Sequence, residues 1–209
     1  MKLHNSIQTK ETTKLFNKKY KFKIVIVTKT ANWFRGNNLA HTKNMLTTPY
    51  TFKNNYPTKE DIEFGTKVLT ALALMNDYTL RVENPFLNVY TNEVTNIEKL
   101  AKINPLKVKY VSLPDSNSES LLTEKTVLVK TLDFDFKVTM GRTHNSFLSF
   151  VNWAKDNPSI KLPKKANKEL GRDYSFGGYY FYVKGEKALT LVKVFLGSNI
   201  QSVDNCIKH

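Results

Sequence analysis

The chain has 209 residues, of which 41% are hydrophobic and 24% are charged, so it can bury a core and is too apolar for a disordered protein. Its apolar runs fall well short of the roughly 20 residues that cross a bilayer, and its single cysteine, Cys206, excludes an internal disulfide. No stretch has the pattern of a signal peptide. We therefore expect a cytoplasmic protein with no membrane segment.

The net charge of +14 is concentrated toward the two ends of the chain. Residues 1–58 hold eleven basic residues against one acidic residue, residues 59–154 hold eleven against twelve, and residues 155–209 hold ten against five. An electropositive surface of this kind is typical of proteins that bind phosphate-rich partners. The alternative is that the Lys- and Asn-rich composition reflects an AT-rich genome and confers only solubility. Such a composition is also compatible with a viral protein in the cytoplasm of its host cell.

The first half of the chain predicts the element order β-α-β-β-α-β. A basic arm over residues 1–19 is expected to be flexible, and a first unit spans 20–114. Hydrophobic periodicity, helix caps and Asn-Pro stops predict its elements: a strand over 20–27, a long loop over 28–58 with a short helix near 39–46, a helix over 59–76, a hairpin of strands 79–82 and 86–90, a helix over 94–101 and a strand over 108–113. A polar connector follows over 115–125.

The second half, over 126–209, repeats this order less regularly. Its predicted elements are strands over 126–132 and 134–140, a helix over 147–154, a short strand at 160–162, a basic helix at 164–170, a strand over 179–183, a helix over 186–196 and a strand over 200–207. Weak internal similarity supports a duplication, because Val89 matches Tyr182 and Asn104 matches Asn199 in equivalent elements.

The repeated order β-α-β-β-α-β is typical of the ferredoxin-like fold, in which two helices cover one face of an antiparallel four-stranded sheet. We therefore predict an α+β protein of two tandem ferredoxin-like units, the second irregular. One merged α+β domain is the alternative.

The sharpest candidate for a binding site is the aromatic run Tyr179 to Tyr182, which follows Gly177-Gly178. It resembles the RNA-recognition modules in layout, since these place aromatic rings on the third strand of the same topology to stack on unpaired bases. Their order of basic, glycine and aromatic residues is not met residue by residue. Phe134 or Phe136, beside Lys137, would supply the ring on the first strand, and we choose Phe136. The alternative is that Tyr180 and Tyr182 fill a contact between the two units.

Two further groups combine basic and aromatic residues. Trp33 and Arg35, with Lys43, could close a loop over a nucleic-acid backbone, although Trp33 would equally pin the loop to the core. The segment 161–172 would place four basic residues on one side of a helix, which suits a row of phosphates or a solvated face. We therefore predict nucleic-acid contacts from Trp33, Arg35, Phe136, Lys137, Lys161, Lys165, Lys168, Arg172, Tyr180 and Tyr182.

Motifs for catalysis are not found. The four histidines and one cysteine give no zinc spacing, and Gly177-Gly178 leads into a strand rather than into a phosphate-binding helix. We predict no catalytic residue, no metal and no cofactor, and a non-catalytic protein that binds nucleic acid, either single-stranded or RNA. A protein that interacts with other proteins or with itself is the main alternative.

A phosphodiester-cleaving enzyme is a minor alternative. His4-Asn5-Ser6-Ile7 and His144-Asn145-Ser146-Phe147 both resemble the His-x-Ser/Thr-apolar motif of two-histidine phosphoesterases. In that family the two imidazoles act as acid and base on a phosphodiester, which the resemblance would imply for His4 and His144.

Overall fold

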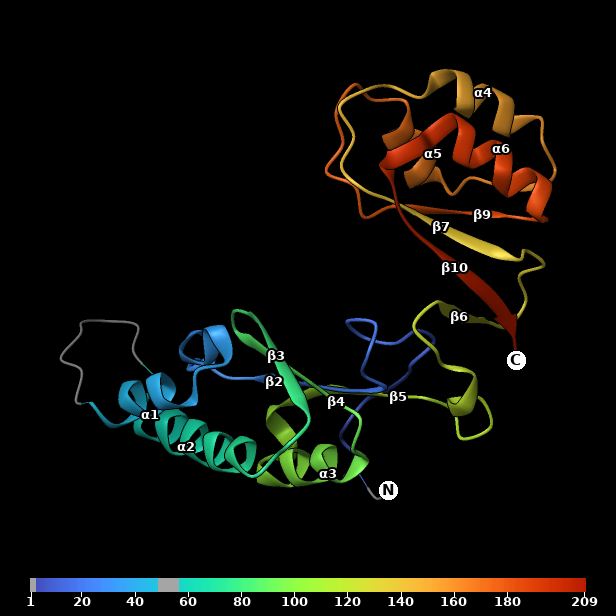
Figure 1. Ribbon diagram of the computed structural model, residues 1–209. Helices are drawn as coiled ribbons and strands as arrows, with labels where there is room; N and C mark the ends of the chain where they lie inside the picture. Colours follow the sequence, from blue (N-terminus) through green and yellow to red (C-terminus); the bar gives the residue numbers. More distant parts are fainter. Residues whose placement is uncertain (1–2, 49–56) are drawn as a thin grey trace. The chain divides into compact units, whose positions relative to one another are not determined.

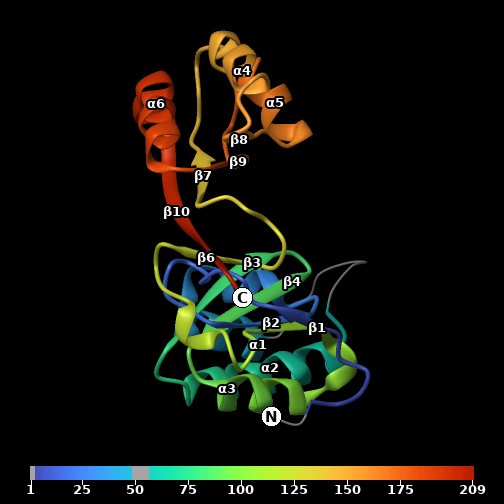
Figure 2. The same cartoon turned by 90° about the vertical axis from the view of Figure 1, so that its right-hand side faces the viewer.

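The computed structural model describes residues 3–48 and 57–209 and divides the chain into two compact units, Met1–Glu119 and Ser120–His209. Each unit contains one five-stranded sheet with its α-helices gathered on one face (Figure 1, and from the side in Figure 2). The described chain is therefore a mixed α+β protein, as the element order predicted. Among the described residues, no helix is both long and apolar enough to span a membrane.

Unit 1 has the strand order β1-β5-β2-β4-β3. Its neighbouring strands pair antiparallel, except that β1 runs parallel to β5 at the edge of the sheet. This arrangement is compatible with a ferredoxin-like unit. In chain order the elements are β1 (Thr9–Glu11), β2 (Phe22–Val27), the 3₁₀ helix η1 (Ala31–Asn37), α1 (Leu39–Thr47), α2 (Lys59–Ala73), β3 (Tyr78–Glu83), β4 (Phe86–Thr91), α3 (Val94–Ile103), η2 (Pro105–Lys107) and β5 (Val108–Leu113).

The start of α2 is fixed by a capping box that also ties the helix to its neighbours. The Thr58 hydroxyl accepts a hydrogen bond from the Asp61 backbone N–H, and the Asp61 carboxylate accepts one from the Thr58 backbone N–H. Val68 and Leu72 follow at a spacing of one helical turn, and both are buried with Ile24 of β2 in the core of unit 1. Polar capping and apolar periodicity therefore place α2 on one face of the sheet.

Unit 2 has the strand order β6-β10-β7-β9-β8, again antiparallel except for the edge strand β6, which runs parallel to β10. Its core packs α4, α5 and α6 against β7 and β9. After η3 (Glu119–Leu121), the elements are β6 (Thr126–Val129), β7 (Phe136–Met140), α4 (Leu148–Lys155), β8 (Ile160–Lys161), α5 (Lys164–Leu170), β9 (Tyr180–Val183), α6 (Glu186–Leu196), η4 (Gly197–Asn199) and β10 (Ile200–Lys208).

The segment that we expected to be a flexible arm, residues 1–19, contains β1. Its residues Thr9, Lys10 and Glu11 pair in parallel register with Val111, Ser112 and Leu113 of β5. All three β1 residues are exposed and none is apolar, so hydrophobic alternation carries no signal for this strand. With β1, the sheet of unit 1 is one strand wider than the four-stranded sheet predicted, whereas each of the five strands of unit 2 lies within a segment that we expected to be extended or overlaps one.

The long loop predicted over 28–58 is partly helical. It contains η1 and α1, and α1 covers the short helix expected at 39–46. Residues 49–56 of this loop lie outside the described residues. The following helix, α2, ends at Ala73 rather than near Asn76, because Leu74 already has a non-helical ψ of 4°.

Candidate nucleic-acid interface

The two faces of β9 differ in what covers them. Tyr179, Phe181 and Val183 are fully buried in the core beneath the helices of unit 2. Tyr180, by contrast, is 40% exposed and Tyr182 is half-buried, because alternate residues of a strand point to opposite faces. The tyrosines therefore lie on the face of the sheet that carries no helix.

Three aromatic rings lie next to one another at this face. The Tyr180 and Tyr182 ring centroids are 5.6 Å apart in an edge-to-face arrangement, and the Phe134 ring centroid is 6.4 Å from that of Tyr182. Edge-to-face packing is a favoured geometry for aromatic pairs, and it holds the rings in place. Since the rings are not coplanar, each offers its own surface to a flat ligand.

Two lysines belong to the same face. In the strand register Lys137 of β7 and Lys161 of β8 lie on either side of Tyr182. The Lys137 ammonium nitrogen is also 4.0 Å from the Tyr180 ring centroid, within range of a cation–π contact. We call the set Phe134, Lys137, Lys161, Tyr180 and Tyr182 the tyrosine face.

The tyrosine face also includes one acidic residue and one phenol with a shifted pKa. Asp204 of β10 lies opposite Lys137 and is 3% exposed, so it offsets part of the local positive charge. Burial raises the pKa of Tyr182 to about 12, and its neighbours Tyr180 and Cys206 add to the shift. The Tyr182 ring therefore carries no negative charge that would repel a phosphate at neutral pH.

Phe136, which we chose as the third ring, is not brought to this face. It is the register partner of Val183 and packs against the core on the helix-covered side. Phe134 takes its place beside Tyr182. The two phenylalanines are two residues apart, so regular strand alternation would have put both side chains on the same face. A bend at Asp135, just before β7 begins, breaks the alternation, and the Asp135 carboxylate accepts a hydrogen bond of 2.7 Å from the Gly185 N–H. Only Asp135, as a turn-forming residue, could have indicated this change.

The predicted helical row of basic residues is not formed. Lys161 lies on β8, whereas Lys165 and Lys168 are exposed residues of α5, which belongs to the helix layer. Arg172 follows the end of α5, and its guanidinium is 2.8 Å from the carboxylate of Glu169. Of these four residues, the structure therefore places only Lys161 on the tyrosine face.

Trp33 and Arg35 belong to η1 of unit 1. Trp33 packs against the core of that unit, and the adjacent Phe34 is buried within it. Arg35 is exposed, and its Nε donates a hydrogen bond of 3.1 Å to the side chain of Asn32. The interpretation in which Trp33 pins this segment to the core thus agrees with the packing, and neither residue belongs to the tyrosine face.

Unit 1 has an equivalent face that its own chain occupies. Lys23 of β2 lies opposite Tyr90 of β4, just as Lys137 lies opposite Tyr182. The Phe16 ring centroid is 5.4 Å from that of Tyr90, and the Lys23 ammonium is 5.4 Å from the centroids of both Tyr90 and Tyr110. Tyr90 is only 5% exposed. We call the set Phe16, Lys23, Tyr90 and Tyr110 the covered face.

The two histidines of the phosphoesterase-like motifs have different surroundings. His4 Nδ1 lies 2.8 Å from the hydroxyl oxygen of Ser6, in unit 1. The His144 ring, in unit 2, meets the Tyr174 ring edge-on at a centroid distance of 5.2 Å. Within residues 3–48 and 57–209, no group of three or more His, Cys, Asp or Glu side chains is placed to hold a metal ion.

Searches for related proteins give no guide to function. No protein-family model matches the chain, and neither a curated protein nor a solved structure matches it.

Proposed function

We propose that the protein binds single-stranded nucleic acid, RNA or DNA, through the tyrosine face and without catalysis. The observation that carries this proposal is the exposed ring of Tyr180 beside Tyr182, with Lys137 and Lys161 on either side of Tyr182, on a helix-free sheet face. We also propose that each unit is ferredoxin-like, since the orders β5-β2-β4-β3 and β10-β7-β9-β8 are those of that fold.

The chemistry of the tyrosine face suits unpaired bases. A base stacked on an aromatic side chain contributes roughly 1–3 kcal/mol and requires no particular sequence. Lys137 and Lys161 would supply the phosphate contacts, and such contacts weaken as salt concentration rises. Because Lys137 sits over the Tyr180 ring, its ammonium would move from the ring to a phosphate when a base takes its place. The single cysteine supports a reducing compartment such as the cytoplasm for this activity.

A second candidate function, binding of a protein partner, is favoured by other surfaces. Phe176, in the loop before β9, is 78% exposed, and Val194 on the outer side of α6 is 77% exposed. Large apolar side chains in the open are typical of protein interaction sites when they cluster, and Val194 has the exposed Leu191 and Phe195 beside it on the same helix.

The experiment that tests the proposal measures binding of fluorescently labelled single-stranded RNA, single-stranded DNA and duplex DNA by anisotropy at roughly 50 and 200 mM salt. We expect single strands to bind more tightly than duplex at both concentrations. The double variant Tyr180→Ala/Tyr182→Ala should bind single strands at least about tenfold more weakly, since two stacking surfaces are lost.

Tyr110→Ala is the matched control, because it removes a tyrosine from the covered face of unit 1 and should leave the affinity unchanged. Circular dichroism would confirm that both variants keep their fold. Unchanged binding by the double variant would contradict a role for the tyrosine face. Weak and equal binding of all three ligands, together with concentration-dependent oligomers, would favour the protein-partner function.

A further inference from the structure

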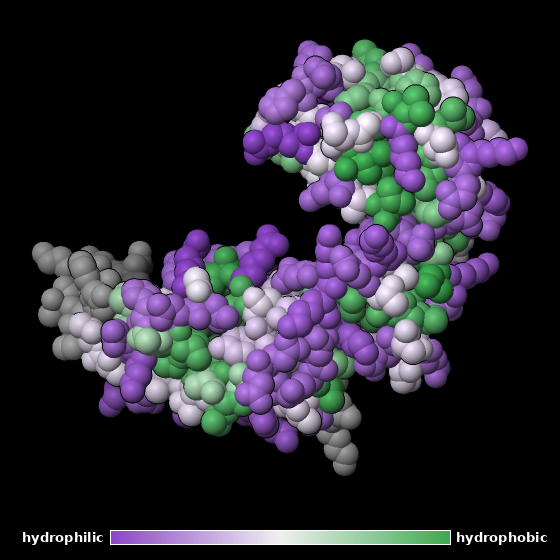
Figure 3. All heavy atoms as spheres, viewed as in Figure 1, coloured by the Kyte–Doolittle hydropathy of each residue, from purple (hydrophilic) through white to green (hydrophobic). Residues whose placement is uncertain are grey.

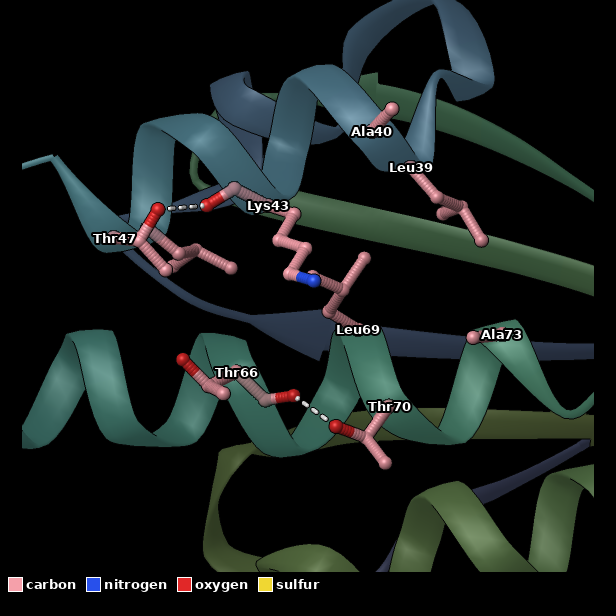
Figure 4. A pocket seen from close by; sticks show the side chains of 9 residues that line it. Leu39, Ala40, Lys43, Thr47, Thr66, Leu69, Thr70 and Ala73 are labelled. Carbon is pink, nitrogen blue, oxygen red and sulfur yellow. Dashed lines mark hydrogen bonds between the residues drawn. The ribbon is translucent and has the colours of Figure 1, made fainter.

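Unit 1 contains a groove between α1 and α2, and none of the residues that line it belongs to the tyrosine face. Its volume is about 410 Å³, within the range of small-molecule sites. The apolar residues Leu39, Leu46, Leu69 and Ala73 line it, and Leu39 of α1 and Ala73 of α2 lie at the same end (Figure 4). Its lining residues on α1 run from Leu39 to Thr47, over about 12 Å at a helical rise of roughly 1.5 Å per residue.

A glycine sets how closely the two helices approach. A Cβ atom on Gly65 would lie 2.8 Å from the Thr30 hydroxyl oxygen and 3.0 Å from Cδ2 of Leu46, closer than such atoms pack. The absence of a side chain at Gly65 therefore lets Leu46 of α1 rest against α2. Leu46 and Leu69 are almost fully buried, so they form an apolar floor to the groove.

The three threonines that line the groove have already donated their hydroxyl hydrogens. Thr47 donates to the Lys43 carbonyl at 3.0 Å, Thr66 donates to the Ile62 carbonyl at 2.9 Å, and Thr70 donates to the Thr66 carbonyl at 3.0 Å. Two of these bonds are drawn in Figure 4. These hydroxyls consequently offer a ligand no hydrogen-bond donor.

Lys43 is the one charged residue among the described residues that line the groove. Its side chain reaches from α1 toward Leu69 across the opening (Figure 4). No acidic residue lines the groove, and no ion pair is formed by Lys43 within the described residues. The groove therefore combines apolar walls with a single cation.

We propose that this groove binds a linear aliphatic carboxylate of medium length, such as a short fatty acid. The alkyl chain lies along Leu39, Leu69 and Ala73, and the carboxylate pairs with the Lys43 ammonium. A carboxylate matches the charge of Lys43, and an unbranched chain matches a narrow slot between two antiparallel helices. This inference does not depend on nucleic-acid binding.

Isothermal titration of the full chain with three ten-carbon ligands tests the proposal: decanoate, decanol and decylamine. We expect decanoate to bind most tightly and decylamine most weakly. Lys43→Gln should weaken decanoate binding about two- to fivefold, the range of an exposed ion pair, and leave decanol binding unchanged. Ala73→Trp, which fills one end of the groove, should weaken binding of both decanoate and decanol.

A control variant separates this site from general effects of removing a positive charge. Lys67→Gln removes a lysine of α2 that lines a different hollow. This variant should bind decanoate as the unmodified protein does. Absence of decanoate binding, equal binding of decylamine, or a decanoate affinity insensitive to Lys43→Gln would each overturn the proposal.

Discussion

The tyrosine face of unit 2 and the covered face of unit 1 occupy the same position in sheets of the same strand order, yet they differ in access. A lysine on the strand next to each tyrosine is common to both, as Lys23 with Tyr90 and Lys137 with Tyr182. Tyr90 is 5% exposed, whereas its equivalent Tyr182 is half-buried and the neighbouring Tyr180 is 40% exposed. The difference comes from Phe16, which lies in the segment between β1 and β2, outside the strands that the two units share.

Of two sheets with the same strand order, one can therefore be covered by a segment that lies outside the strands common to both. Phe16 pairs through its backbone with Tyr20, so the chain turns back just before β2 and brings a ring onto Tyr90. In unit 2 the segment just before β7 supplies only Phe134, which packs beside Tyr182 and leaves Tyr180 partly exposed.

The two units can be followed separately because each has one tryptophan in contact with its own core. Trp33 packs against the core of unit 1 and Trp153 against the core of unit 2, and the chain contains no other tryptophan. In a Trp33→Phe variant, the fluorescence of Trp153 would therefore report the unfolding of unit 2. In a Trp153→Phe variant, the fluorescence of Trp33 would report the unfolding of unit 1.

The largest expected effect comes from Gly177→Ala in unit 2. Gly177 has a φ of +77°, and a Cβ atom there would lie 2.4 Å from the backbone carbon of Gly141. Strain and overlap together should lower the free energy of unfolding of unit 2 by about 3 kcal/mol or more. Urea unfolding followed by Trp153 measures this change, and the transition of Trp33 should not move.

Gly178→Ala is the control for Gly177→Ala. Gly178 also has a positive φ, +73°, but a Cβ atom there meets nothing within 4 Å. Only the backbone strain remains, so the loss should be about 1–2 kcal/mol. Equal losses for the two variants would show that the close approach to Gly141 is unimportant.

A smaller effect is expected from Asp61→Asn in unit 1. Burial would raise the pKa of Asp61, but hydrogen bonds from Lys107 and Thr58 outweigh it and hold the pKa well below its usual value of 3.8. The carboxylate therefore stabilises unit 1 above about pH 4, and this contribution is lost as the pH falls through the folded-state pKa. Asp61→Asn should cost about 2 kcal/mol at pH 7 and less at pH 3.

Urea unfolding followed by Trp33 at both pH values measures the Asp61 contribution. Asp133→Asn is the matched change in unit 2, where Asp133 forms an exposed ion pair with Lys184. Exposed pairs contribute little, so no shift in the Trp153 transition is expected. A loss for Asp61→Asn that does not shrink at pH 3 would rule out the ionised carboxylate as its cause.

Phe16→Ala tests directly why the two faces differ. The substitution is made in the Tyr180→Ala/Tyr182→Ala variant, where it uncovers Tyr90. It should restore part of the affinity for single strands, by less than one stacking interaction of roughly 1–3 kcal/mol. Anisotropy at low salt measures the gain. No gain in a folded variant would show that the covered face lacks more than an open ring.

The last effect is measured by spectroscopy and concerns the protonation of Tyr182. Burial raises its pKa to about 12, above the ordinary value near 10, so the folded state holds this proton more tightly than the unfolded state. Stability should accordingly fall as the pH rises from about 10 to 12. The difference between the ultraviolet titrations of the unmodified protein and Tyr182→Phe gives the pKa, and a value near 10 would contradict the burial of this phenol.

The sequence predicted the mixed α+β class and, apart from β1, the order of the strands and α-helices, because apolar periodicity is strong in segments such as β2 and α2. It also placed Tyr180 and Tyr182 on one face, since alternation along a strand is regular. The internal match was shifted by one residue: the register makes Tyr90, not Val89, the equivalent of Tyr182. A shift of one residue exchanges the two faces of a strand, so the similarity between the tyrosine face and the covered face was hidden.

Two other features could not be predicted from periodicity. The bend at Asp135 decides whether Phe134 or Phe136 reaches Tyr182, and a single bend leaves no periodic pattern. The groove beside Lys43 depends on Gly65, whose role appears only when Leu46 of another helix is placed against it. In both cases the deciding contact joins residues that hydrophobic patterning treats independently.

The short parallel strands β1 and β6 have a consequence for the edges of the two sheets. Open sheet edges invite pairing with other chains, and proteins limit this risk with short, charged or covered edge strands. The two sheets have four edge strands. Three of them are short: β1, β6 and β8 have three, four and two residues. The fourth edge strand, β3, packs against η1. A fragment that begins at Tyr20 would contain every strand of the four-stranded sheet that periodicity predicts, and it would still leave β5 open to pairing with a second chain.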